Sequence, residues 1–409
     1  MKRSFSFRQR VLLASGLGLI AATYGLVRLA YGLFLPDVQR DLGLDDGAAG
    51  WISSGASVLY CIGAAGGFLL AARVPRGLVL AAALVAGAGA FGMAAAPDAV
   101  VFGTASVVGS AAAGLASPAL VRLVAAGVPD DRQDRAQSVV NAGTGPGLVG
   151  AGALALVLLP DWRTAWAVSG VFALVAGGVL LAASHGDERT SRSADRGRGP
   201  DRGWTAAHLG VIGLALLFGA GSAVVWTYGR SVLVDAGAPV VVSVVAWIAL
   251  GVGGAAVVLT TRWTSRFPAA TTWTATTGAV AVAVVALGVW PQSTPTALVA
   301  CAVFGWGYTA ATGALITWTS EIDAARASAG TSVLFVALVL GQAGGAALAG
   351  VLVGSAGTLA AFAAGAVVTA GSAALGPVVR AAVGARSSGC TPPTPRSRRA
   401  ARSRRPAGP

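Results

Sequence analysis

The chain has 409 residues, of which 55% are hydrophobic and only 11% are charged, and its mean hydropathy is +0.72. A soluble globular domain carries about 25% charged residues, so this composition excludes a single water-soluble core. The net charge of +13 does not indicate a nucleic-acid partner, because all but four of the 29 Lys and Arg residues lie in the tails or in alternate loops, as membrane orientation requires.

Twelve apolar stretches follow one another along the chain, and each is long enough to cross a bilayer. A helix needs about 20 apolar residues to cross about 30 Å of hydrocarbon. We place the spans at 11–35, 48–72, 77–96, 99–124, 136–159, 163–184, 205–229, 240–262, 270–290, 296–319, 327–354 and 358–383. The sequence therefore predicts an all-α polytopic membrane protein whose functional site lies between its helices.

The positions of the basic residues predict the orientation of the chain. Arg40 and Arg163 lie in loops of the opposite side, and Arg28 and Arg230 lie in or at the edge of spans. The positive-inside rule then places both termini in the cytoplasm. The expected divisions are a cytoplasmic tail at 1–10, a six-helix bundle at 11–184, a cytoplasmic central loop at 185–204, a second six-helix bundle at 205–384 and a disordered basic cytoplasmic tail at 385–409.

A repeated pattern indicates that the two sets of six spans are duplicates. Tyr31 and Gly32 are followed by a Trp-Ile pair at 51–52, and Tyr228 and Gly229 are followed at nearly the same offset by a Trp-Ile pair at 247–248. We therefore expect two pseudo-symmetric six-helix bundles, with a substrate site at their interface near the middle of the membrane.

Arg28 is the charged residue that lies deepest in the predicted first span. It lies roughly 10 Å below the predicted outer end of its helix, where a charge costs about 2.5–3.5 kcal/mol and needs a cavity or a partner. Tyr24, Arg28 and Tyr31 follow i, i+4, i+7 spacing and are expected on one face. A guanidinium between two phenols suits a carboxylate or another oxyanion. The alternatives are an Arg28 side chain that reaches the outer surface, or a structural ion pair.

The seventh span repeats this arrangement with Ser222, Trp226 and Arg230 at i, i+4 and i+8. Trp226 and Arg230 are candidate substrate-binding residues because they are expected to share a helix face. Arg230 lies nearer the outer end of its span. Contact with the outer surface or an ion pair with Asp235 is an equal alternative for it.

Trp306 and Tyr308 give the tenth span a polar and aromatic character, which suits either the wall of a substrate cavity or packing and interfacial anchoring. Both residues are candidates for substrate binding. We expect no carboxylate inside the membrane, because Asp37, Asp235 and Glu321 all lie near predicted interfaces. Coupling to protons therefore stays open.

Glycine and proline residues within the spans indicate close helix packing or bending. A small residue lets a neighbouring helix approach closely, and a proline frees a backbone carbonyl within the helix. Static packing and a rocking helix are both consistent with the pattern. The candidates for this role are Asn141, Gly145, Pro146 and Gly150 in the fifth span and Gly341 and Gly345 in the eleventh.

Residues for catalysis or cofactor binding do not form any recognisable set. The two histidines, His185 and His208, have no metal-ligand spacing, no Ser, His and acid arrangement suits a hydrolase, and no phosphate-binding glycine loop precedes a lysine. We expect neither an enzyme nor a cofactor or metal site.

Several motifs in their order along the chain resemble the major facilitator superfamily. The segments 28–36 (RLAYGLFLP) and 226–230 (WTYGR) look like its YbfB/YjiJ-like bacterial branch. The run 141–152 (NAGTGPGLVGAG) is similar to the Gly-Pro motif of the superfamily's antiporters, and 109–118 (GSAAAGLASP) resembles its fourth-span glycine motif. The resemblance implies a bacterial cell (inner or plasma) membrane protein that moves a solute by alternating access, with a central site between the first, fourth, seventh and tenth spans.

Two departures from the superfamily pattern affect what the resemblance implies. The segment 67–76 (GFLLAARVPR) lacks the acid of the loop motif between the second and third spans, and Ala105 stands where the fourth-span motif has an arginine associated with proton movement. These departures put in doubt the cytoplasmic charge latch and proton antiport.

The function expected from the sequence is secondary transport of a small organic anion, with Arg28 binding the anion and Tyr24, Tyr31 and Trp226 shaping the pocket. The alternatives are an exporter of lipophilic compounds or drugs by antiport, and a transport-inactive membrane sensor or scaffold. The expected partners are a small-molecule substrate, membrane lipids and, if transport is coupled, a proton. We expect a monomer.

Overall fold

The computed structural model describes residues 5–184 and 202–388, and in those ranges every regular element is a helix. Twelve helices there are long and apolar enough to cross a membrane, which confirms the predicted spans. The expectations for most of the central loop (185–201) and of the basic tail (389–409) lie outside the described residues.

The helices divide into an N-terminal and a C-terminal half. The first span runs through α1 (Phe7–Ile20), the π-helix η1 (Ala21–Leu29) and α2 (Ala30–Leu42). The rest of the N-terminal half is α3 (Asp46–Leu70), α4 (Pro75–Ala94), α5 (Ala99–Gly127), η2 (Asp130–Arg132), α6 (Gln133–Asn141), α7 (Thr144–Leu158) and α8 (Trp162–Ala183). The C-terminal half is α9 (Arg202–Tyr228), α10 (Ser231–Asp235), α11 (Val240–Thr264), α12 (Ala269–Val289), α13 (Thr294–Ile322), η3 (Ala324–Arg326), α14 (Ala327–Ala356) and α15 (Thr358–Ser388).

The first span is longer than the sequence pattern predicted, and the boundaries 11–35 are wrong at both ends. Its helix begins at Phe7, because Ser6 forms a capping box with Gln9 that satisfies free backbone N–H groups. It continues through Pro36 and ends at Gly43, which has a φ of 62° and so adopts the left-handed conformation favoured by glycine. Arg28 therefore lies about 21 Å from the end of the helix at Leu42, close to the middle of the span.

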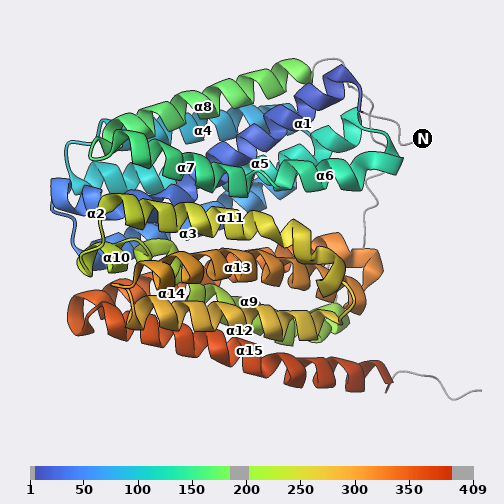
Figure 1. The fold of residues 1–409 in the computed structure, drawn as a ribbon. Coiled ribbons are helices and arrows are strands. Elements are labelled where there is room, and N and C mark those ends of the chain that lie inside the picture. The colour runs from blue at the N-terminus through green and yellow to red at the C-terminus, as the bar shows by residue number, and fades with distance from the viewer. Residues whose placement is uncertain (1–4, 185–201, 389–409) are drawn as a thin grey trace, which may run out of the picture.

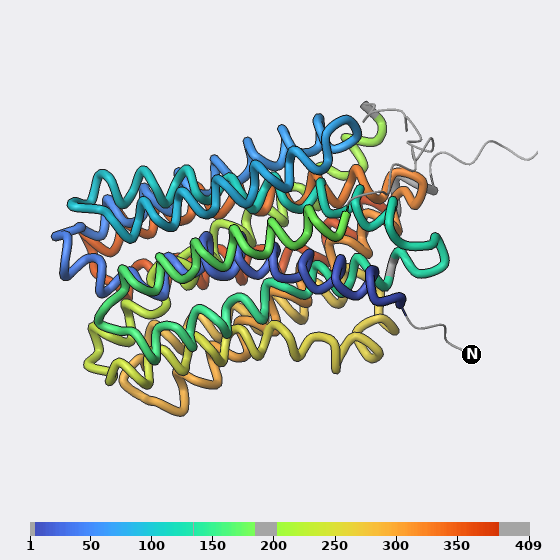
Figure 2. The backbone as a smooth tube through the Cα atoms, turned by 90° about the horizontal axis from the view of Figure 1, so that it is seen from above, coloured from blue at the N-terminus to red at the C-terminus, as the bar shows by residue number. Residues whose placement is uncertain are grey.

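The two halves lie side by side along a common long axis. In Figure 1, α4 and α8 lie in the upper part of the molecule and α12 and α15 in the lower part, and Figure 2 shows the helices running in the same direction when seen from above. The seam between the halves is formed chiefly by α3 against α14 and α7 against α11. This arrangement matches the two six-helix bundles that the sequence predicted.

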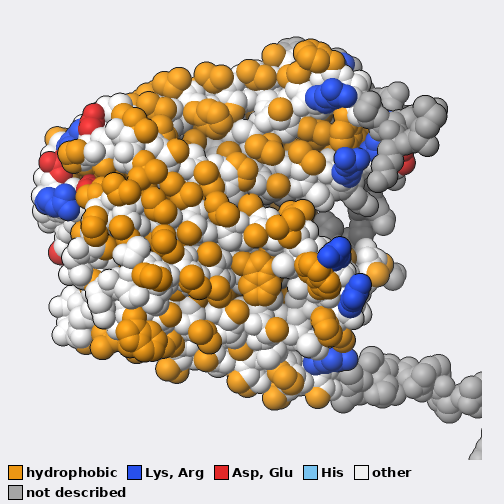
Figure 3. All heavy atoms as spheres, in the orientation of Figure 1, with side chains coloured by type: hydrophobic (Ala, Val, Ile, Leu, Met, Phe, Trp, Pro, Cys, Tyr) orange, Lys and Arg blue, Asp and Glu red, His pale blue; other side chains and the backbone are white. Residues whose placement is uncertain are grey.

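The surface of the bundle has the polarity that a membrane protein needs. Hydrophobic side chains are spread over the face shown in Figure 3, while Arg side chains gather at one end and acidic and Arg side chains at the other. We call the end at which α1 begins the terminus side, and the end that carries the loop between α2 and α3 the opposite side. A broad apolar band between two charged ends suits a bilayer core about 30 Å thick.

Glycines hold the first helix of each half close to a partner helix. A Cβ atom on Gly147 of α7 would lie 2.5 Å from the carbonyl oxygen of Ala21, and one on Gly345 of α14 would lie 2.1 Å from that of Ala220 in α9. Neither position has room for a side chain, so backbone packs directly on backbone. The seventh and first spans are thus each packed against a glycine-rich helix of their own half.

The other residues selected for packing or bending have different surroundings. Asn141 is exposed and ends α6, and α7 begins only at Thr144, so the fifth span is interrupted just before Pro146. Gly145 faces α11, and a Cβ atom added to it would lie 3.6 Å from the Cβ of Ala255. A Cβ added to Gly150 would make an ordinary van der Waals contact with Leu26, at 3.8 Å. A Cβ on Gly341 would lie 2.1 Å from the carbonyl oxygen of Leu216.

Candidate functional site

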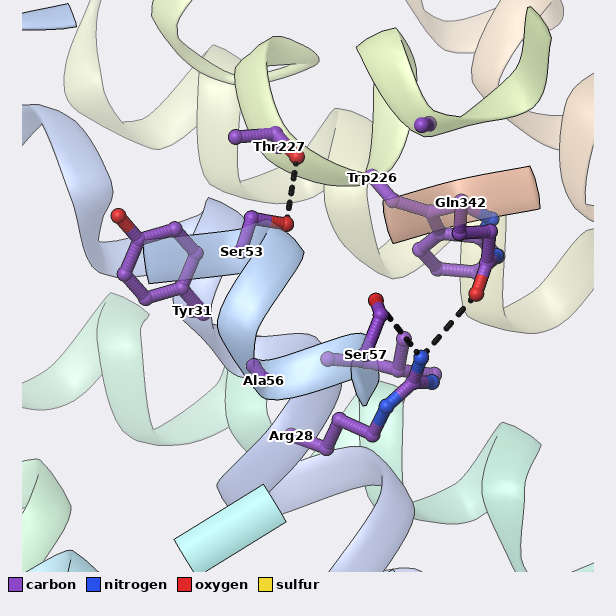
Figure 4. Close-up of a pocket in the computed structure, with 10 residues that line it drawn as sticks. Arg28, Tyr31, Ser53, Ala56, Ser57, Trp226, Thr227 and Gln342 are labelled. Carbon is purple, nitrogen blue, oxygen red and sulfur yellow. Dashed lines mark hydrogen bonds between the residues drawn. The ribbon is translucent and has the colours of Figure 1, made fainter. Parts of the chain in front are cut away.

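A small cavity lies between the two halves, near the middle of the bundle. Its volume is about 30 Å³, which leaves room for roughly one or two water molecules. Both halves contribute to its wall, as Figure 4 shows. The lining residues are Arg28, Leu29, Tyr31, Ser53, Ala56 and Ser57 from the N-terminal half and Ala223, Trp226, Thr227 and Gln342 from the C-terminal half.

Arg28 is the cationic residue of this cavity. One terminal nitrogen donates to Gln342 Oε1 at 3.1 Å and to Ser57 Oγ at 3.4 Å, and the guanidinium carbon lies 4.8 Å from the centre of the Tyr60 ring. The Nε atom is buried and has no hydrogen-bond partner. No carboxylate among residues 5–184 and 202–388 is paired with Arg28. Its partners in the described chain are therefore neutral.

Arg28 lies in the π-helix η1, between Tyr24 of the same segment and Tyr31 of α2. A π-helical segment has wider turns than an α-helix, and such segments are frequent at functional sites. The Tyr24 hydroxyl forms hydrogen bonds with the hydroxyls of Tyr60 at 3.0 Å and Ser117 at 2.9 Å. The Tyr31 ring lines the cavity, but its hydroxyl donates to the carbonyl of Ala49 at 2.9 Å and points away from Arg28 in Figure 4.

The C-terminal half supplies an aromatic cluster next to the cavity. Trp226 lies edge-on to Phe304, Tyr308 and Trp247, with ring centres 5.5, 5.1 and 6.3 Å away. The Tyr308 hydroxyl accepts a hydrogen bond from Gln342 Nε2 at 2.9 Å, so Gln342 connects Arg28 with this cluster.

Trp306 lies outside the cavity lining. Its Nε1 donates to the hydroxyl of Thr260 in α11 at 2.9 Å, which fixes the indole against a helix of its own half.

The structure places Arg230 outside the cavity and on the opposite side of the molecule. Its side chain is 1% exposed, forms an ion pair with Asp37 and donates to the carbonyl of Leu33 at 2.7 Å and to Ser243 Oγ at 3.1 Å. The alternative pairing with Asp235 is therefore wrong. Burial, followed by the nearby charge of Asp46, raises the pKa of Asp235.

Asp37 lies near the opposite-side end of the bundle, as expected, but it is buried inside the protein. This residue belongs to α2, inside the extended first span, and its side chain is 4% exposed. The sequence pattern ended the first span at 35, just before Pro36. Because the helix continues, Asp37 turns inward to meet Arg230 of the other half.

Sequence reasoning missed four polar residues of the cavity wall: Ser53, Ser57, Thr227 and Gln342. Ser53 Oγ and Thr227 Oγ1 are hydrogen-bonded across the seam at 2.9 Å. Gln342 stands between glycines of a span selected only for packing. An amide in an apolar span was the available signal, because such a group needs hydrogen-bond partners inside the membrane.

No group of three or more His, Cys, Asp or Glu residues that could hold a metal ion occurs in the described part of the chain. His208 is buried, and its ring nitrogens lie 2.9 Å from the carbonyl oxygen of Trp204 and 2.9 Å from the hydroxyl of Thr319. These contacts are made within the C-terminal half, between α9 and α13.

A family model described as the Major Facilitator Superfamily matches residues 17–337. The chain belongs to the major facilitator superfamily. A comparison with curated proteins found no match. The YbfB/YjiJ-like branch stays a prediction from the motifs of 28–36 and 226–230.

Several solved structures of transporters have a fold similar to that of this chain. A peptide transporter has a TM-score of 0.74 at 13% identity, with 92% of this chain and 95% of that chain covered. A nucleoside transporter has a TM-score of 0.72 at 13% identity, with 91% and 99% covered. The xylose transporter XylE from E. coli has a TM-score of 0.71 at 16% identity, with 91% and 97% covered. At these identities the likeness establishes the fold alone.

Proposed function

We propose that this chain is a secondary active transporter that carries a small organic anion across the bacterial cell membrane by alternating access. The observation that carries the proposal is Arg28, a guanidinium at mid-span that faces the cavity between the halves and has only neutral partners among the described residues. The superfamily and its fold support the transport reaction. Arg28 supports the choice of substrate.

The energetics of Arg28 favour an anionic ligand. A charge at the centre of a membrane costs about 2.5–3.5 kcal/mol even on insertion scales, and it is normally compensated by a partner or by water. Ser57 and Gln342 each accept one hydrogen bond, which leaves the positive charge without a negative partner. A substrate carboxylate would supply the charge and accept charge-assisted hydrogen bonds.

The arrangement of the halves suits alternating access. A cavity of about 30 Å³ is too small for an organic solute, so the halves must part for the substrate to enter. On the opposite side they are joined by the Arg230–Asp37 pair and by a hydrogen bond from the Tyr228 hydroxyl to the carbonyl of Asp46. With the termini cytoplasmic, as the basic residues predict, these contacts close the outer side of the transporter.

A thermal-shift screen of the purified full chain in detergent tests the proposal. The compounds are carboxylates, sugars, amino acids and lipophilic cations, and Arg28→Gln is measured beside the native chain. A ligand at 100 times its Kd stabilises the folded state by about 2.7 kcal/mol, enough to move the melting temperature visibly. We expect carboxylates to stabilise the native chain and the control variant Arg73→Gln, which changes an exposed arginine, but not Arg28→Gln.

The other outcomes of this screen decide against the proposal. If lipophilic cations shift the native chain and Arg28→Gln equally, Arg28 is structural and export of lipophilic compounds replaces anion transport. A sensor or scaffold is distinguished by flux, because a chain lacking residues 387–409 should still transport its substrate in proteoliposomes. Loss of a signalling output without any measurable flux in the full chain would favour the sensor.

A further inference from the structure

Two buried hydrogen-bond donors without partners belong to the same cavity, one from each half. They are Nε of Arg28 in η1 and Nε1 of Trp226 in α9. A buried donor without an acceptor carries a desolvation cost, and most such groups in proteins are paired. Unpaired indole nitrogens also occur on Trp166 and Trp247, but neither residue lines the cavity. What distinguishes this pair is that both residues line one cavity.

The charge around the cavity is suited to one negative charge. Arg28 is the one ionised side chain among its described lining residues, and the polar remainder consists of hydroxyls and one amide. A single carboxylate neutralises this guanidinium. A second carboxylate of the same ligand would be brought into the membrane interior without a cation beside it, which costs free energy.

The rest of the cavity wall is apolar or aromatic. Leu29, Ala56 and Ala223 line it together with Trp226, and Phe304 and Tyr308 pack edge-on against the Trp226 ring. These surfaces cannot satisfy further polar groups of a ligand, and the polar lining residues Ser53, Thr227 and Gln342 are already hydrogen-bonded to protein partners. They favour a compact apolar body attached to the carboxylate.

We infer that the substrate is a monocarboxylate with a compact apolar body, and that its carboxylate is shared between Arg28 of one half and the indole N–H of Trp226 of the other. This inference rests on the proposed function and narrows its substrate class. The shared carboxylate joins the halves across the cavity. Substrate binding thereby favours the conformation in which the halves are close, as an alternating-access transporter requires.

The test measures the Kd of matched ligand sets by isothermal titration calorimetry on the full chain in detergent. Each set holds a monocarboxylate, the corresponding dicarboxylate and the corresponding neutral amide: propionate, malonate and propionamide; butyrate, succinate and butyramide; benzoate, phthalate and benzamide. The variants are Trp226→Phe, which keeps an aromatic ring but removes the N–H group, and Arg28→Gln. Trp166→Phe is the matched control, because it removes an equally unpartnered indole N–H outside the cavity and away from Trp226.

We expect at least one monocarboxylate to bind more tightly than its dicarboxylate and its amide. Trp226→Phe should raise the Kd of that ligand about tenfold or more, as expected for the loss of a hydrogen bond to a charged acceptor, and Trp166→Phe should leave it unchanged. Melting temperatures of the ligand-free variants show that each is folded.

Each contrary result has a separate meaning. If a dicarboxylate binds at least as tightly and still depends on Arg28, the single-charge inference is overturned while the proposed anion transport stands. If Trp226→Phe binds the monocarboxylate as tightly as the native chain, the shared carboxylate is overturned. If no carboxylate binds in a manner that depends on Arg28, the inference and the proposed function both fail.

Discussion

At the scale of single residues, the neutral character of Gln342 is as important as the charge of Arg28. Gln342 Oε1 accepts from Arg28 at 3.1 Å, while its amide nitrogen donates to Tyr308 at 2.9 Å. The amide therefore orients the guanidinium without neutralising it. A carboxylate at the same position would be a permanent internal counter-ion and would compete with an anionic substrate.

Gln342→Glu tests this role. We expect the variant to melt at a higher temperature than the native chain, because a buried charge without an anionic partner gains one. Carboxylates should no longer stabilise it, because the guanidinium is already neutralised. Gln342→Met, which has a similar volume but no charge, serves as the control and should keep Arg28-dependent binding, although more weakly. A Gln342→Glu variant that binds carboxylates as the native chain does would contradict the proposed role of Arg28.

At the scale of helices, glycine packing aligns α9 and the first span, which carry the two donors of the site. Gly345 lies against the backbone of Ala220, one turn or two before Trp226, and Gly147 lies against Ala21 at the start of η1. Close backbone approach at these points leaves little freedom for the helices that position Arg28 and Trp226. Packing at the glycines thus acts on the site through the helix backbone.

Two adjacent glycines of α14 provide a matched comparison for this packing. A Cβ on Gly345 would lie 2.1 Å from the carbonyl oxygen of Ala220, whereas one on the exposed Gly344 meets nothing within 4 Å. Gly345→Ala should destabilise the protein by about 1–3 kcal/mol through overpacking. Gly344→Ala should be neutral or stabilise it by up to about 1 kcal/mol. Thermal melting in detergent measures both, and equal melting temperatures would contradict the close approach of α14 and α9.

At the scale of the whole molecule, the Asp37–Arg230 pair joins the halves on the opposite side. The two side chains are 4% and 1% exposed. Removing one partner of a buried pair leaves the other charge uncompensated, which is far more costly than removing both. The ion pair of Arg163 with Asp41 lies at the same side but within one half, and its side chains are 38% and 47% exposed.

A double-mutant cycle distinguishes these two pairs. Asp37→Asn should destabilise the protein by about 3–5 kcal/mol, and adding Arg230→Gln should restore much of that loss. Asp41→Asn should cost only about 0–1 kcal/mol, because its pair is exposed to solvent. Melting temperatures of the native chain, the two single variants and the double variant give the coupling energy between Asp37 and Arg230. Additive effects of Asp37→Asn and Arg230→Gln would show that the pair does not join the halves.

The sequence by itself determined the twelve spans and the two bundles, and it selected Arg28 and Trp226, which both line the cavity. Hydrophobicity over about 20 residues is a local property, so it can be read without knowing which helices are neighbours. An ionisable group in an apolar span is conspicuous for the same reason. The end of the first span could not be read in this way, because the helix continues past Pro36 into the polar segment 37–42, where hydrophobicity gives no signal.

Only the tertiary structure decided which side chains meet. Gln342 lies 314 residues from Arg28 along the chain, and Asp37 lies 193 residues from Arg230. The hydroxyls of Tyr24 and Tyr31 likewise bond to Ser117 and to the carbonyl of Ala49, which are partners that the spacing of the first span could not name. Partners for a buried charge are selected by the packing of whole helices, and no local pattern of hydrophobicity contains that information.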